Sequence, residues 1–152
     1  RDGLLLGVKP NDGEQWSGTF APGALRANGG RCVFATADAD ALGILVDGAS
    51  YLVSTADPRT WAMVDEDEVV HVRPIVERSM ILYGTRTYLV AYSGLKKLWQ
   101  TERLVIDELT LTDAGPDTIS GTGAPDTNET FEVDTETGIV RSKKPLWIPV
   151  DK

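Results

Sequence analysis

An internal repeat constrains this sequence more than any other feature. Residues 44–53 recur at 81–90 with a shift of 37 residues and no gap. The matched residues in the first copy are Ile44, Leu45, Tyr51, Leu52 and Val53, and one inserted residue later Trp61 meets Trp99. A period between about 20 and 50 residues is typical of a supersecondary element that is copied and stacked. Short β-hairpins also resemble one another through composition alone, so duplication and coincidence both stay open here.

Short apolar runs bounded by turn residues make up most of the chain. Asp47-Gly48 separates the runs 42–46 and 50–55, and Asp-Gly in this setting is a strong hairpin signal. Pro74 lacks an amide donor, so its strand starts there or runs along a sheet edge. No stretch has the period of a long amphipathic helix. The sequence predicts one all-β domain over residues 1–152, an antiparallel sandwich or barrel of repeated hairpins of about 37 residues, with small propeller-like blades as the alternative.

The last third of the chain also carries a family resemblance. Residues 99–104, 107–109, 121–123 and 131–138 resemble a C-terminal pattern of uncharacterised bacterial all-β proteins. These residues are mostly those of turns and strands. The resemblance therefore implies an all-β fold and brings no activity with it.

Composition excludes several classes of protein. The longest apolar run is far shorter than the roughly 20 residues of a membrane span, so the sequence predicts a soluble chain with no membrane partner. Cys32 is the single cysteine, which excludes an intramolecular disulfide and a cysteine-rich zinc site. The sequence begins at Arg1 and not at Met, as in a processed or trimmed chain, so the compartment stays open.

The formal charge of −8 argues against nonspecific binding to nucleic acid or anionic lipid, because both require a basic surface. Residues 104–140 contain nine acidic side chains and no Lys or Arg, whereas residues 71–103 contain six basic and two acidic ones. If these segments are neighbours, part of the imbalance is neutralised internally. We expect the remainder to form an acidic face for a protein partner with a basic surface. Its candidate residues are Asp113, Asp117, Asp126 and Glu129.

Few residues suit catalysis or metal binding. His71 is the only histidine, and a partly buried structural role is favoured for it. Cys32 stands among apolar residues and is predicted to lie in the core. Asp113 with Asp117, and Asp126 with its neighbours, have oxygen ligands that suit calcium, but neither group has the spacing of an EF-hand. The sequence therefore predicts no catalytic residue, no metal and no cofactor.

The four tryptophans allow two interpretations. Exposed indoles stack on sugar rings, so Trp16, Trp61, Trp99 and Trp147 suit a carbohydrate platform. Aromatic residues that recur at a repeat period are more often shared core packing. We therefore expect both Trp61 and Trp99 to be mostly buried.

Taken together, these residues favour a noncatalytic binding or scaffold module that binds protein. Two alternatives stay open. One is a hydrolase with paired carboxylates in the acidic third, drawn from Asp107, Glu108 and Asp134. The other is a carbohydrate-binding module that uses exposed tryptophans.

Overall fold

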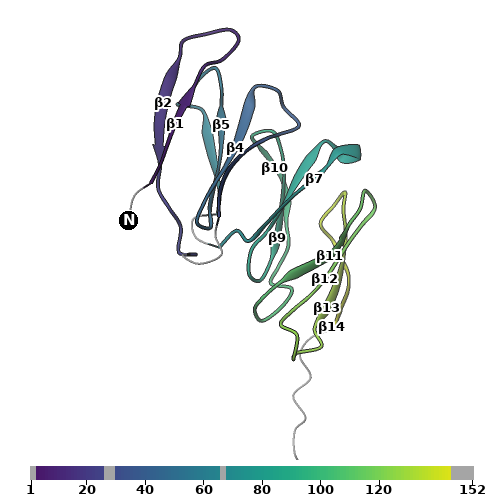
Figure 1. Cartoon of the computed structure of the whole chain (residues 1–152). Coiled ribbons are helices and arrows are strands. Elements are labelled where there is room, and N and C mark those ends of the chain that lie inside the picture. Colours follow the sequence, from purple (N-terminus) through teal and green to yellow (C-terminus); the bar gives the residue numbers. More distant parts are fainter. Residues whose placement is uncertain (1–2, 26–29, 66–67, 145–152) are drawn as a thin grey trace, which may run out of the picture. The chain divides into compact units, whose positions relative to one another are not determined.

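The computed structural model describes residues 3–25, 30–65 and 68–144. Trp147, one of the four tryptophans considered above, lies outside these residues. Within them the chain forms strands β1 to β14 and one 3₁₀ turn, η1 (Figure 1). The bounds are β1 Leu4–Val8, β2 Trp16–Phe20, β3 Arg31–Ala35, β4 Ala41–Val46, β5 Ala49–Ser54, β6 Trp61–Asp65, β7 His71–Ile75, η1 Val76–Arg78, β8 Met80–Gly84, β9 Leu89–Ser93, β10 Lys96–Gln100, β11 Thr110–Ala114, β12 Thr118–Thr122, β13 Thr130–Asp134 and β14 Val140–Lys144.

The strands form four sheets in which consecutive strands are neighbours. We name them sheet A (β1-β2), sheet B (β3-β4-β5-β6), sheet C (β7-β8-β9-β10) and sheet D (β11-β12-β13-β14). The prediction of an antiparallel all-β chain is confirmed, and the described residues form no closed barrel. Four-stranded meanders have the strand order of propeller blades, which was the alternative architecture. Among the described residues no helix is long and apolar enough to cross a membrane.

The 37-residue shift corresponds to a whole sheet. It carries β4 onto β8 and β5 onto β9, so sheets B and C are the two copies of the repeat. Tyr51 lies inside β5, whereas Tyr88 lies one residue before β9. Asp47 and Gly48 form the predicted two-residue turn, with φ of 49° and 97°. Both values are positive, which the favoured hairpin turn requires and which glycine accepts without strain.

A cross-strand pair of a glycine and a ring recurs in sheets B, C and D. The pairs are Phe34 with Gly43, His71 with Gly84, and Phe131 with Gly121. A Cβ atom at Gly43 would lie 2.0 Å from the ring of Phe34, and one at Gly121 would lie 2.3 Å from the ring of Phe131. Each ring therefore occupies the space that a side chain would need on the opposite strand. In sheets B and C the ring is on the first strand and the glycine on the second, whereas in sheet D the ring is on the third strand, so the pair matches sheet B with sheet C only.

The chain divides into two compact units. Unit 1 comprises Arg1–Val70 and Tyr92–Lys96, and unit 2 comprises His71–Ala91 and Lys97–Lys152. The prediction of a single domain over residues 1–152 stays a prediction.

The core of unit 1 lies between sheets A and B. Its buried members come from β4 and β5, and apolar residues of β1, β2 and β6 pack against them. The buried members are Ile44, Val46, Ala49, Tyr51 and Val53. Alternate residues of β5 point to this core, so Leu52, which is also fully buried, lies on the opposite face of sheet B.

The core of unit 2 lies between sheets C and D and the segment that joins them. Leu82, Leu89, Ile119 and Val133 are completely buried in it. Trp99 belongs to the same core with 9% of its surface exposed, and its indole N–H donates to the Thr135 carbonyl oxygen at 3.0 Å. The predicted burial of Trp99 is therefore confirmed.

Candidate functional site

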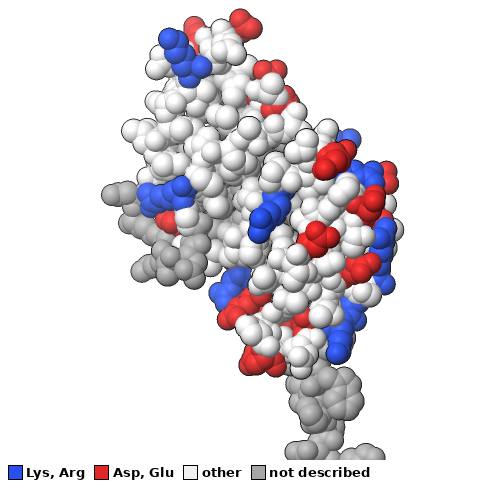
Figure 2. All heavy atoms as spheres, turned by 45° about the vertical axis from the view of Figure 1, so that its right-hand side comes forward, with Lys and Arg blue, Asp and Glu red and all other residues white. Residues whose placement is uncertain are grey.

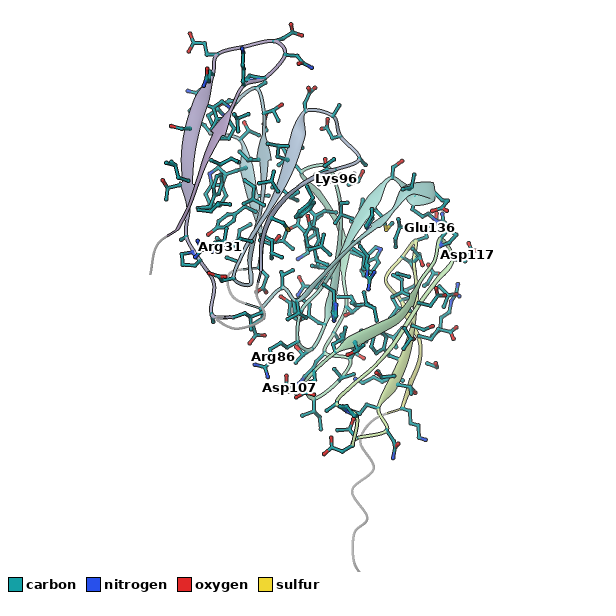
Figure 3. The ribbon with its side chains drawn as sticks, in the orientation of Figure 1. Arg31, Arg86, Lys96, Asp107, Asp117 and Glu136 are labelled. Atoms are coloured by element: carbon teal, nitrogen blue, oxygen red, sulfur yellow. The ribbon has the colours of Figure 1, made fainter. Side chains whose placement is uncertain are left out.

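Three carboxylates of the acidic third, Asp107, Asp117 and Glu136, pair with arginines of the basic segment that precedes it. Arg86 donates two hydrogen bonds to Asp107, at 2.8 and 2.6 Å, and Figure 3 shows the two side chains together. Arg78 lies 3.4 Å from a carboxylate oxygen of Asp117 and 3.5 Å from one of Glu136. Figure 2 likewise shows acidic and basic side chains interspersed on the visible face. The predicted internal neutralisation is confirmed for these pairs.

The structure does not bring the four predicted acidic binding residues onto one face. Glu129 is only 3% exposed, and its carboxylate accepts from the backbone N–H of Ile106 at 3.0 Å. A surface role for Glu129 is therefore wrong, because its charge is satisfied inside unit 2. Asp117 precedes β12 and Asp126 follows it, so they lie at opposite ends of that strand. Asp113 lies in β11 and lines a separate cleft with Arg73. A partner-binding role for Asp113, Asp117 and Asp126 stays a prediction.

Two carboxylates of the hydrolase alternative, Asp107 and Asp134, have lowered pKa values. The Arg86 side chain, with the backbone N–H of Glu108, lowers the pKa of Asp107 below its ordinary value. The backbone N–H and hydroxyl of Thr137, with Arg141, lower the pKa of Asp134. A carboxyl group that acts as a general acid needs a raised pKa, so Asp107 and Asp134 are not suited to that role.

The prediction made for His71 is confirmed, whereas the one made for Cys32 is wrong. His71 is half-buried, and its Nε2 lies 2.9 Å from the Leu109 carbonyl oxygen, which confirms the structural role. Cys32 is exposed, so the prediction that it lies in the core is wrong. It lies on β3, an edge strand of sheet B, and sequence alone does not show which strand is an edge. Among the described residues, no three side chains of the kinds that bind metals are grouped together.

Trp61 is the second residue whose predicted burial is wrong. Its exposed fraction is 55%, although its counterpart in the repeat, Trp99, is buried. Trp61 starts the edge strand β6 and lines a groove of about 330 Å³ in unit 1. We call this the aromatic groove, and its lining residues are Trp16, Ser17, Gly18, Thr19, Phe20, Tyr51, Val53, Pro58 and Trp61.

Period-two alternation builds one wall of the aromatic groove. Trp16, Gly18 and Phe20 share the inner face of β2, whereas Ser17 and Thr19 are exposed on the other. A Cβ atom at Gly18 would lie 3.4 Å from the Trp16 ring and 3.5 Å from the Phe20 ring. Gly18 therefore leaves the space between the two rings open.

The rings of the aromatic groove are held in place by contacts inside unit 1. The Phe20 and Tyr51 centroids are 5.3 Å apart with an interplanar angle of 61°, which is an edge-to-face arrangement. The Tyr51 hydroxyl donates to the Ala21 carbonyl oxygen at 2.8 Å, and the Trp16 indole N–H donates to that of Thr55 at 2.8 Å. Two of the polar ring groups are thus already satisfied, and no charged side chain of the described residues lines the groove. The groove can therefore accept an apolar group without a cost in buried charge.

Comparison with known proteins adds little to this description. No family model and no curated protein matches the chain. The crystal structure of the N-terminal domain of Nup159 is similar with a TM-score of 0.47 and 11% identity, over 85% of this chain. This chain spans 31% of that one. A likeness of this extent carries no functional assignment, and the resemblance to bacterial all-β proteins stays a prediction.

Proposed function

We propose that this chain is a noncatalytic module that binds a protein partner through the aromatic groove of unit 1. The observation that carries the proposal is the 55% exposure of Trp61 at the edge of a groove whose other rings are fixed. Tryptophan is among the residues that contribute most to binding energy at protein interfaces. A rigid groove also loses little conformational entropy when a partner binds.

The lining of the groove favours a protein partner over a carbohydrate. A sugar ring that stacks on an indole also presents hydroxyl groups, which need hydrogen-bonding side chains around the platform. Beyond Tyr51, whose hydroxyl is occupied, only Ser17 and Thr19 among the described lining residues carry a hydroxyl, and both belong to the exposed face of β2. An apolar side chain from a peptide requires no such groups. Carbohydrate binding is therefore the second candidate.

Two probes test this proposal on the complete chain. One is a phage-displayed library of random 12-residue peptides, and the other is a panel of soluble hexasaccharides measured by calorimetry. We expect the chain to enrich peptides and to bind no sugar. Binding of the enriched peptides should fall at least tenfold in Trp61→Ala. Ile139→Ala is the matched control, because Ile139 is an exposed apolar residue in unit 2, outside the groove.

Three outcomes would contradict the proposal. They are sugar binding that requires Trp61, peptide binding that is unchanged in Trp61→Ala, and the enrichment of no peptide.

A further inference from the structure

The edge strand β6 contains no Lys, Arg or Pro, unlike most of the other edges of the four-stranded sheets. Natural edge strands avoid pairing with other chains by means of charged side chains, proline or bulges. The other edges contain Arg31 on β3, Arg73 and Pro74 on β7, Lys96 and Lys97 on β10, a register shift on β11, and Arg141, Lys143 and Lys144 on β14. Strand β6 reads Trp-Ala-Met-Val-Asp, and both its register shift and its one charged residue, Asp65, lie beyond Met63. This edge is therefore open to a further strand.

The pairing of β6 with β5 shows which backbone groups face outwards. The Ser54 N–H donates to the Thr60 carbonyl oxygen at 2.9 Å, so these two residues form a hydrogen-bonded pair. Hydrogen-bonded and non-hydrogen-bonded pairs alternate along an antiparallel ladder. The non-hydrogen-bonded pairs are therefore Val53 with Trp61 and Tyr51 with Met63. Trp61 and Met63 direct their N–H and C=O groups away from β5, and within the described residues no hydrogen bond satisfies them.

The same two residues direct their side chains to the aromatic side of sheet B. Trp61 lines the aromatic groove, and Met63 packs against the core of unit 1. A strand added beside β6 would lie about 4.8 Å from it. Every second side chain of that strand would then point to the groove side of the sheet, next to Trp61. One segment can therefore use the open edge and the groove together.

The charge near β6 indicates which strand fits. The strand ends at Asp65, which carries a negative charge. A Lys or Arg on the added strand would be attracted to this end, whereas an acidic residue would be repelled.

We infer, on the basis of the binding function proposed above, that the partner contributes an extended segment that pairs with β6 as an additional strand. The segment has apolar residues at alternate positions and a Lys or Arg at the end near Asp65. Backbone hydrogen bonds to Trp61 and Met63 give affinity, and the aromatic groove selects the apolar side chains.

N-methylation of the bound peptide tests this pairing. The probe is the most enriched peptide from the random library, synthesised with one backbone amide N-methylated at a time. We expect methylation at alternate central positions to weaken binding about threefold to tenfold each, the equivalent of one hydrogen bond. Methylation at the positions between them should have a smaller effect. A uniform profile, or an enriched consensus rich in proline without apolar alternation, would overturn strand addition.

Variants of the chain separate this inference from the proposed function. Met63→Pro removes an outward N–H and leaves the hydrogen bonds to β5 intact, because edge strands tolerate proline at such positions. Met63→Leu is the matched control. We expect Met63→Pro to weaken binding of the peptide at least tenfold and Met63→Leu to leave it unchanged. If Trp61→Ala abolishes binding while Met63→Pro does not, strand addition fails and the groove function stands. If neither variant has an effect, both proposals fail.

Discussion

The indole of Trp61 lies 6.4 Å from the ring of Tyr51, between centroids, with the two planes tilted by 49°. Tyr51 is buried and held by Phe20 and by the Ala21 carbonyl oxygen, so Trp61 rests on a fixed support. Trp99, its counterpart in the repeat, has its indole N–H bonded inside unit 2. Two residues that match in sequence therefore have different physical roles.

This difference predicts unequal effects on stability. Trp99→Ala should lower the free energy of unfolding by about 3–5 kcal/mol, because it removes a buried ring and leaves a cavity. Trp61→Ala should cost less than about 1 kcal/mol, since more than half of that side chain is already in water. Urea unfolding of each variant measures the two values. Equal losses would mean that Trp61 packs into a core, which would remove the main support for the proposed binding site.

The glycine of the cross-strand pair in sheet D predicts a second contrast. A Cβ atom at Gly121 would lie 2.3 Å from both the Phe131 ring and the Thr110 carbonyl oxygen, and the latter belongs to the backbone. Gly121→Ala should therefore destabilise the chain by about 1–3 kcal/mol through overpacking. Gly7→Ala in β1 is the control, because no heavy atom of the described residues beyond its two chain neighbours lies within 4 Å of the Cβ position. Thermal unfolding should show a lower midpoint for the first variant and no loss for the second.

Substitutions of Glu129 and Asp126 compare a buried carboxylate that accepts a hydrogen bond with an exposed one. Glu129→Ala removes a buried side chain and leaves the partly buried Ile106 N–H without its acceptor, at a cost of about 1 kcal/mol or more. Asp126→Ala should stay within about 0.5 kcal/mol of the wild type, as surface substitutions usually do. Chemical unfolding distinguishes the two variants. If Glu129→Ala leaves the free energy of unfolding unchanged, the carboxylate is not needed for the stability of unit 2.

Local signals predicted much of the fold. The Asp47-Gly48 turn, the placement of Pro74 on an edge strand and the matching of β4 with β8 all depend on residues close in sequence. The pairing of Gly121 with Phe131 in sheet D appears only once the strand register is known.

Burial at the edges of sheets could not be predicted in the same way. Cys32 and Trp61 lie on the edge strands β3 and β6, and their exposure depends on which sheet covers which strand. The apolar composition of their neighbours does not contain that information. Glu129 is the converse case, since its hydrogen-bond partner Ile106 lies 23 residues away in the chain. The aromatic groove was missed for the same reason, because β2 and β6 meet only in the folded unit.

The pairing of Asp107 with Arg86 predicts how stability depends on pH. Arg86 lowers the pKa of Asp107 in the folded chain. In the unfolded chain the pKa of this carboxyl group has its ordinary value of about 3.9. Folding thus favours the ionised carboxylate, so the stabilisation is complete above the unfolded pKa and is lost as the pH falls through the lowered folded pKa. Asp107→Asn should remove this contribution, at a cost of less than about 1 kcal/mol at neutral pH, since solvent screens a half-exposed pair.

Urea unfolding between about pH 7 and pH 3 measures this effect. The stability of Asp107→Asn should fall less steeply than that of the wild type below about pH 4, near the unfolded pKa. The free energy of unfolding of Asp107→Asn should still fall with decreasing pH, because the pKa values of Asp57 and Asp134 are also lowered. Asp113→Asn is the control, since Asp113 is exposed and has no ion pair within the described residues. If the stability of Asp107→Asn depends on pH as steeply as that of the wild type, the ion pair with Arg86 does not hold the carboxylate ionised in solution.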